Sequence, residues 1–194
     1  MIDYSQFGEQ AILSDLLTET TGVYIDIGAH NGIVCSNTRF LWEKGWSGVL
    51  VEPTKRHIEI TKNYPERATV FPYAVSDYVG QADFYDIDNP LDGRSAFYNF
   101  GLPSQKITVQ VTSWLGLLEL INVAGVKIED VKMLSIDTEG QDFTILNQID
   151  FSVFNPRVVV AEFGFGAFDK INNLMTTNKY TLIKQTYANL IYKK

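Results

Sequence analysis

One short stretch constrains the fold of this chain more than any other, an apolar run that ends in a glycine-containing turn, GVYIDIGAHNG at residues 22–32. Val23 to Ile27 are mostly β-branched or aromatic, which is typical of a strand buried on both faces of a parallel sheet. Gly28 and Gly32 permit positive φ angles and a close approach of a ligand to the backbone. Because ligands of open α/β sheets bind just beyond the carboxyl ends of strands, this turn is the first predicted binding site.

Length and charge limit the possible classes of function. A chain of 194 residues fits one domain, and we expect a single domain over residues 1–194. The net charge of −7 argues against a nucleic-acid-binding surface, which needs clustered Lys and Arg. The sequence shows no signal-peptide pattern and no apolar run of the roughly 18 residues that a membrane span needs. Cys35, the single cysteine, is expected to be a small buried side chain, and the chain is predicted to be cytoplasmic.

Strand and helix patterns alternate along the chain. Strands are predicted at residues 23–27, 47–52, 69–75, 81–85, 107–111, 131–137, 158–162, 181–185 and 189–192. Helices are predicted at residues 12–17, 38–44, 54–64, 112–121, 141–149 and 168–178, with Ser36 and Thr112 among the expected N-caps. This alternation, closed by an antiparallel hairpin, predicts a three-layer αβα sandwich.

Two polar segments carry no clear period and leave two interpretations open. Residues 86–106 are rich in Asp, Asn, Pro, Gly and Ser, with Arg94 as the only arginine and three aromatic residues. Long structureless loops are uncommon inside compact domains, so this one is either a substrate-covering loop or a packed surface excursion. The polar cluster at residues 4–10 is likewise either an exposed lead-in to a helix or a cofactor-facing segment.

Four predicted strands end in a carboxylate, and this is the strongest functional pattern in the sequence. The residues are Asp26, Glu52, Asp137 and Glu162. If these strands are parallel, all four carboxylates lie along one edge of the sheet. Glu52 follows Asp26 by 26 residues, near the spacing of about 20 at which nucleotide-binding α/β folds place a ribose-binding acid.

The turn also restricts the kind of nucleotide. A dinucleotide lays its pyrophosphate on a G-x-G-x-x-G turn, but His30 stands where the second glycine is needed, so NAD and FAD are disfavoured. The sequence contains no P-loop motif. A nucleoside without phosphates but with a cationic centre suits both this turn and the nearby acids. S-adenosylmethionine (SAM), with its sulfonium, amino group and ribose diol, meets this description.

Seven segments carry a resemblance to the FkbM-type methyltransferases, a branch of the class I SAM-dependent enzymes. They read SQFGE at residues 5–9, DIGAHNG at 26–32, SNT at 36–38, GWSG at 45–48 leading to EP at 52–53, AVSD at 74–77, SIDTEG at 135–140 and NLIY at 189–192. They follow the order of the family and span nearly the whole chain. Residues 92–96, DGRSA, also resemble the serine-containing loop of that family.

The resemblance implies a Rossmann-like fold with a seven-stranded, mostly parallel sheet whose last strand is antiparallel. It implies that Glu52 holds the ribose hydroxyls and that Ser76 and Asp77 flank the adenine. The methionine end of SAM would contact Asp26, Gly28, Ala29 and Asn31, and Asn37 is a further expected cofactor-binding residue. Family members of known activity are mostly O-methyltransferases that act on sugar or polyketide hydroxyls, so the expected acceptor is a small molecule or glycan.

Methyl transfer to oxygen needs an aligned acceptor and a group that takes its proton. Asp137 and Glu139 are the predicted candidates, either as a base or, with Glu162, as ligands of a divalent metal such as Mg²⁺. Thr138 and Glu139 have an alternative structural role as caps of the next helix. His30 is a further candidate base, or a side chain that covers the cofactor.

Two other classes of function stay open. One is a non-catalytic SAM-fold or carbohydrate-binding module that keeps the carboxylates for structure. The other is an NAD-dependent nucleotide-sugar enzyme on the same sheet. Neither interpretation requires a nucleic acid or a membrane as a partner.

Overall fold

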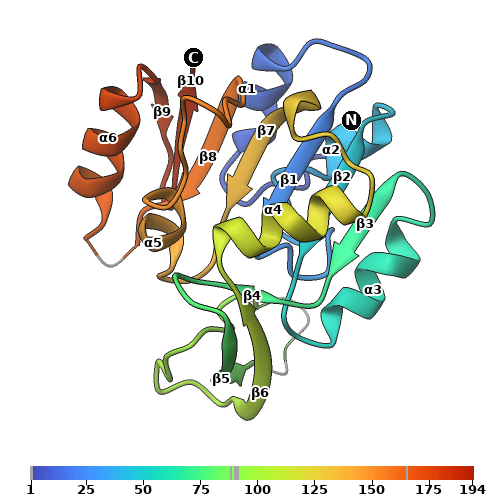
Figure 1. Cartoon of the computed structure of the whole chain (residues 1–194), viewed down its shortest axis with the longest axis vertical. Helices are drawn as coiled ribbons and strands as arrows, with labels where there is room; N and C mark the ends of the chain where they lie inside the picture. Colours follow the sequence, from blue (N-terminus) through green and yellow to red (C-terminus); the bar gives the residue numbers. More distant parts are fainter. Residues whose placement is uncertain (1, 88, 90–91, 165) are drawn as a thin grey trace.

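The structure is a computed structural model that describes residues 2–87, 89, 92–164 and 166–194. The main element is a seven-stranded sheet, and a smaller three-stranded sheet lies below it in Figure 1. The helices are α1 (Glu9–Leu16), α2 (Arg39–Glu43), α3 (Arg56–Asn63), α4 (Trp114–Val123), the 3₁₀ helix η1 (Ile128–Asp130), α5 (Asp142–Leu146) and α6 (Phe168–Thr177). The strands of the main sheet are β1 (Val23–Ile27), β2 (Ser47–Val51), β3 (Ala68–Phe71), β7 (Val131–Ile136), β8 (Val158–Glu162), β9 (Thr181–Gln185) and β10 (Asn189–Lys193).

The strand order of the main sheet is β3-β2-β1-β7-β8-β10-β9. The first five strands in this order are parallel, and β10 is antiparallel to both of its neighbours. The direction of strand addition reverses between β1 and β7, and the crevice at such a reversal is where open α/β sheets bind ligands. The parallel pairing also brings the carboxyl ends of β1, β2, β7 and β8 to one edge, as the strand-end acids predict.

Each face of the main sheet has its own apolar core. The core on one face is built with α1, α2 and α3, through side chains such as Leu13, Phe40 and Ile60. The core on the other face is built with α4, α5 and α6, and α4 crosses in front of the sheet in Figure 1. This arrangement confirms the predicted three-layer sandwich. Among the helices of the described residues, none is long and apolar enough to cross a membrane.

The small sheet corrects one predicted strand. Residues 69–75 were expected to form a single strand, but the chain turns at Pro72 and Tyr73 into two strands of different sheets. A proline lacks the N–H that continues a strand ladder, and the Tyr73 N–H turns back to the Phe71 carbonyl at 3.0 Å. The strands of the small sheet are β4 (Ala74–Val75), β5 (Gly80–Asp86) and β6 (Gln105–Thr112), in the order β4-β6-β5.

The two predicted helix caps lie close to the observed ones but not at them. The N-cap of α2 is Thr38 and not Ser36, although the Ser36 hydroxyl accepts from the backbone N–H groups of Thr38 and Arg39 at 3.3 and 3.0 Å. For α4 the cap is one residue later than predicted, because the Ser113 hydroxyl, and not that of Thr112, accepts from the Gly116 N–H at 3.2 Å.

Gly28 is required at the end of β1 by packing against β7. Its φ is +84°, and a Cβ atom there would lie 1.7 Å from the carbonyl oxygen of Asp137. Gly32 also has a positive φ, +77°, and a Cβ there would lie 2.4 Å from the ring of Tyr64. Both turn glycines therefore permit close packing within the protein itself, in addition to the conformational freedom expected from the sequence.

We expect the substitution Gly28→Ala to destabilise the fold much more than Gly125→Ala, measured by urea unfolding. Both glycines have similar positive φ angles, +84° and +77°, but a Cβ at Gly125 would meet no atom within 4 Å. The control therefore measures the backbone strain alone, about 1–2 kcal/mol. Gly28→Ala adds a clash with a backbone carbonyl that no side-chain rotation can relieve. Equal losses of unfolding free energy in the two variants would contradict this packing role.

Candidate active site

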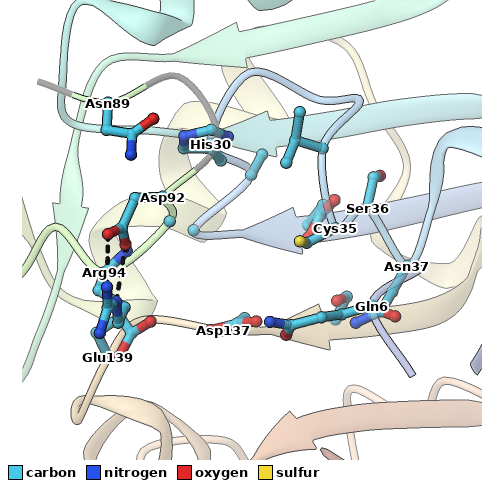
Figure 2. A pocket seen from close by; sticks show the side chains of 16 residues that line it. Gln6, His30, Cys35, Ser36, Asn37, Asn89, Asp92, Arg94, Asp137 and Glu139 are labelled. Atoms are coloured by element: carbon cyan, nitrogen blue, oxygen red, sulfur yellow. Dashed lines mark hydrogen bonds and ion pairs between the residues drawn. The ribbon is translucent and has the colours of Figure 1, made fainter. Parts of the chain in front are cut away.

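A cavity of about 410 Å³ opens at the point where the strand order reverses, between the ends of β1 and β7. Figure 2 shows its lining, which is mostly polar. The residues are Gln6, Asp26, Gly28, Ala29, His30, Val34, Cys35, Ser36, Asn37, Asn89, Asp92, Gly93, Arg94, Ser135, Asp137 and Glu139. They come from the segment before α1, the two strand ends, the turn after β1, and the loop after β5. The sheet edge and two loops together therefore enclose one cavity.

The turn after β1 is folded over the end of β2. The N–H groups of Gly28 and Ala29 donate to the Val51 carbonyl at 2.9 and 3.1 Å. The N–H of His30 donates to Oε2 of Glu52 at 3.0 Å. Glu52 thus holds the turn in place while its carboxylate stays at the strand end.

His30 lines both this cavity and a smaller one. The residue is 9% exposed, and neither ring nitrogen has a hydrogen-bond partner among the described residues. Burial and the nearby Arg56 lower the pKa of His30 to about 4, so its imidazole is neutral near pH 7. The exclusion of a pyrophosphate by His30 stays a prediction.

Backbone strain is concentrated around the cavity. Five residues other than glycine have a positive φ among those the structure describes, and His30, Cys35 and Glu139 all line the cavity. Such conformations are costly for residues with a side chain and are common at functional sites. Cys35 was expected to be buried, but it is exposed and lines the cavity, with a φ of 56°.

Asp26 is the buried acid at the centre of the site. It is 4% exposed, and its Oδ2 accepts from the Thr38 hydroxyl at 2.6 Å. Desolvation raises the pKa of Asp26 to about 6, against the opposing hydrogen bonds from Thr38 and Ser135. The carboxylate is therefore ionised near pH 7 and well placed to attract a cationic group.

The carboxylate of Glu52 begins a polar chain toward the loop after β5. Oε1 accepts from the Thr54 hydroxyl at 2.5 Å, and Thr54 Oγ1 lies 3.4 Å from Nη1 of Arg56. Arg56 forms an ion pair with Asp86 at 2.5 Å, and Asp86 accepts from the Ser95 hydroxyl at 3.1 Å. Arg56 is 8% exposed, so this chain is an internal connection between the end of β2 and the loop that closes the cavity.

A second cavity of about 40 Å³ adjoins Glu52. Its lining is more apolar and shares Gly28, His30, Gly93 and Asp137 with the first cavity. Pro53, Val75, Phe84 and Phe97 are among its walls. Glu52 therefore lies between a polar compartment and an apolar one.

Three carboxyl groups meet at the ends of β7 and β8. Asp137, Glu139 and Glu162 each place one oxygen within 4.8 Å of the others. Desolvation is the main cause that raises the pKa values of all three, and repulsion from the nearby Asp142 adds to it. The pKa of Glu139 rises to about 7, and those of Asp137 and Glu162, which Glu139 also repels, rise well above their usual range. The cluster therefore holds at least one proton near neutral pH, and Glu139 changes its charge in that range.

Glu139 does not cap the helix that follows it, which was the alternative structural role considered for this residue. The helix α5 has no side-chain cap at its N-terminus. The turn before α5 is held by Asp142, which accepts from the N–H groups of Thr138 and Gly140, both at 3.2 Å. Glu139 is thus left free of that structural task, with its side chain at the cavity wall.

The predicted cofactor residues divide into two groups. Asp26, Gly28, Ala29 and Asn37 line the large cavity and Glu52 lines the small one. The other three, Asn31, Ser76 and Asp77, line neither cavity.

The hydrogen bonds of two of these residues explain their positions. Asn31 Oδ1 accepts from the N–H groups of Ile33 and Val34, both at 3.0 Å, so its side chain stabilises the turn itself. Ser76 contacts Gln141 at 3.0 Å and follows Val75, which lines the small cavity.

Sequence reasoning missed several residues of the site. Ser135 is inside a strand, and only its position opposite Asp26 in the β1–β7 register reveals its role. Arg56 and Asp86 belong to distant segments, and no sequence spacing links them. Asp92 and Arg94 pair at 2.6 Å on the cavity wall, and they show that the loop at residues 86–106 contributes to the site. The part of that loop at residues 88, 90 and 91 is outside the described residues.

Comparison with known proteins agrees with this geometry. The chain is similar in structure to the precorrin-6y C5,15-methyltransferase from Geobacter metallireducens GS-15, with a TM-score of 0.51 and 11% sequence identity over 95% of this chain and 85% of that chain. At this identity the likeness shows the fold alone, and it confirms the predicted Rossmann-like methyltransferase architecture. No curated protein gives a significant match to the sequence.

A family model described as the methyltransferase FkbM domain matches residues 26–182. The match covers most of the chain, and it includes the turn after β1, the acid at the end of β2 and the carboxyl cluster of β7 and β8. The chain belongs to the FkbM methyltransferase domain family.

Proposed function

We propose that the protein is a SAM-dependent O-methyltransferase that acts on a hydroxyl of a sugar, a glycan or a related small molecule. The observation that carries the proposal is the position of Glu139, whose pKa is raised to about 7, on the wall of a cavity that also contains the buried acid Asp26. A group with a pKa near neutrality suits removal of a proton from an acceptor hydroxyl.

The residues of the large cavity fit SAM. Its volume of about 410 Å³ is within the range of roughly 300–1,000 Å³ that small-molecule sites occupy. The ionised carboxylate of Asp26 suits a ligand with positive charge. Asn37 is 4% exposed and its Oδ1 has no partner among the described residues, which leaves an acceptor for an ammonium group. Glu52, at the adjoining cavity, has lone pairs left for ribose hydroxyls.

Alignment of the acceptor and removal of its proton are the tasks of residues of the chain. When bound, SAM supplies an electrophilic methyl group on a sulfonium. The loop with Asp92 and Arg94 and the segment with Gln6 border the space in which an acceptor hydroxyl would be aligned, and alignment accounts for a large share of such rate accelerations. Glu139 takes the hydroxyl proton, and desolvation together with repulsion from Asp142 keeps its pKa at about 7.

His30 is the weaker candidate for the base. Its ring nitrogens are buried, and its pKa of about 4 makes it a poor proton acceptor near pH 7. We assign it the role of a wall that closes the turn side of the cavity. The same carboxyl cluster also has the composition of a divalent-cation site, although protonated carboxyls bind Mg²⁺ weakly.

Calorimetry tests the cofactor directly. We expect micromolar binding of SAM and of its demethylated product, and no binding of NAD, because His30 fills the pyrophosphate position. Glu52→Gln should weaken SAM binding by about tenfold, since charge-assisted hydrogen bonds to the ribose become neutral ones. The matched control is Glu59→Gln, an exposed residue of α3. Failure of the wild-type protein to bind SAM would overturn the proposal.

Turnover separates an enzyme from a binding module. With an acceptor found by screening sugars with labelled SAM, Glu139→Gln should lower kcat by about 10²–10⁴-fold while SAM affinity stays close to that of the wild type. Asp137→Asn should also lower kcat, because it alters the charge of the same cluster. Glu129→Gln, in η1 at the start of β7, is the control. Near-wild-type rates in both cluster variants would contradict the carboxylate mechanism.

The pH profile of kcat/KM reports the free enzyme. A base must be deprotonated to act, so the rate should fall below a pKa of about 7, that of Glu139, by tenfold per pH unit, and reach a plateau above it. Glu139→Gln should remove this limb. The profile is measured with and without a chelator, and loss of the rate on chelation at every pH would favour a metal site instead.

A further inference from the structure

Two aromatic rings are exposed side by side near the active site. Phe7 and Tyr187 have ring centroids 5.1 Å apart and planes inclined at 48°. Their exposed fractions are 40% and 84%, which is unusual for paired aromatic side chains that the fold could have buried. The sequence match to the family model, at residues 26–182, includes neither of them.

A buried carboxylate holds the two segments that carry these rings. Glu9 is 0% exposed, and its Oε2 accepts from the N–H of Phe7 at 2.8 Å. Its Oε1 accepts from the Thr186 hydroxyl at 2.7 Å and from Nδ2 of Asn189 at 3.0 Å. Three hydrogen bonds to one buried carboxylate fix the segment before α1 against the β9–β10 turn, so the ring pair has a defined position.

The same contacts place the rings beside the catalytic cluster. Asn189 is the partner of Glu162 in the β8–β10 register, and the N–H of Phe163 donates to the Ala188 carbonyl at 3.0 Å. Gln6, directly before Phe7, lines the large cavity, and its amide points toward Asp137 in Figure 2. The segments that carry the rings are therefore joined to the cavity through Gln6 and to the end of β8 through Ala188 and Asn189.

The charge near the rings restricts what can bind there. Asp26, Asp92, Asp137 and Glu139 line the cavity, Glu162 adjoins it, and the one arginine of the lining, Arg94, is paired with Asp92. The lining of the cavity therefore carries more acidic than basic side chains. An acceptor with a carboxylate or phosphate would be repelled.

We propose that Phe7 and Tyr187 form a stacking platform for the acceptor, and that this acceptor is a neutral or amino-substituted pyranose and not an anionic sugar. The proposal rests on the proposed function and names the substrate class of the same site. A pyranose has C–H groups on its faces and hydroxyls at its rim. It therefore matches two aromatic rings that are bordered by the Gln6 amide and by carboxylate acceptors.

A second copy of the chain is a less suitable occupant. Stable protein interfaces have an apolar centre from which charged residues are depleted, whereas Asn189, two residues after Tyr187, pairs with Glu162 of a cluster of three acids. The oligomeric state of the variants tests this alternative.

Saturation-transfer NMR tests the platform with three probes, methyl β-D-glucopyranoside, glucosamine and glucuronate, in the presence and absence of S-adenosylhomocysteine. We expect saturation of the ring C–H protons in the first two probes, and at least about tenfold weaker binding of glucuronate. Tyr187→Ala and Phe7→Ala should each weaken binding of the neutral probe by about tenfold, from loss of stacking. Tyr187→Phe, which keeps the ring, should retain most of the affinity.

Further measurements distinguish the platform from the proposed function. Calorimetric affinity for S-adenosylhomocysteine should be the same in wild type and Tyr187→Ala, since the ring lies outside the cofactor cavity. Equal sugar binding by all variants, no saturation of the neutral probe by wild type, or preference for glucuronate would each overturn the platform while leaving SAM binding intact. A change of oligomeric state in Tyr187→Ala, measured by light scattering, would also overturn it.

Discussion

The structure depends on the close approach of two parallel strand ends, those of β1 and β7. The N–H of Asp137 donates to the Ile27 carbonyl at 2.9 Å, which extends the strand ladder to the edge of the sheet. Directly beyond, Gly28 packs so closely against the Asp137 carbonyl that no side chain fits. This contact brings the acids of the two strands into one desolvated space, and it fixes the turn that bears His30.

Desolvation of the acids at this edge lowers the stability of the fold, but it also raises their pKa values into a range that is useful for proton transfer. Ionised carboxylates buried near one another are unfavourable, so the pKa values of Asp137, Glu139 and Glu162 rise. The fold stabilises them incompletely, since Oε2 of Glu162 is buried without a partner among the described residues. A group that is easily protonated and easily deprotonated near neutral pH is what a base for a hydroxyl requires.

The sequence predicted the main sheet well because its signals are local. The apolar strands, the turn glycines and the strand-end acids each lie within a few residues, and parallel pairing then brings Asp26, Glu52 and Asp137 to one edge without further information. One error was local, because Pro72 interrupts the predicted strand at residues 69–75 and the chain continues into a second sheet. The side chain of Asn31 holds the turn, and its contact with the cofactor stays a prediction. Arg56 could not be assigned, because its partner Asp86 belongs to that second sheet.

The small sheet therefore contributes to the site, because its residue Asp86 connects the Glu52 region to the loop that borders the cavity. Through Arg56, the carboxylate of Glu52 is connected to Asp86 and then to Ser95, in the loop that borders the cavity. A buried arginine that loses any of these partners leaves an uncompensated charge, so the chain of contacts favours one position of the loop. The residue proposed to hold ribose and the loop proposed to border the acceptor are thus parts of one polar network. This network gives a physical reason for the two binding events to depend on each other.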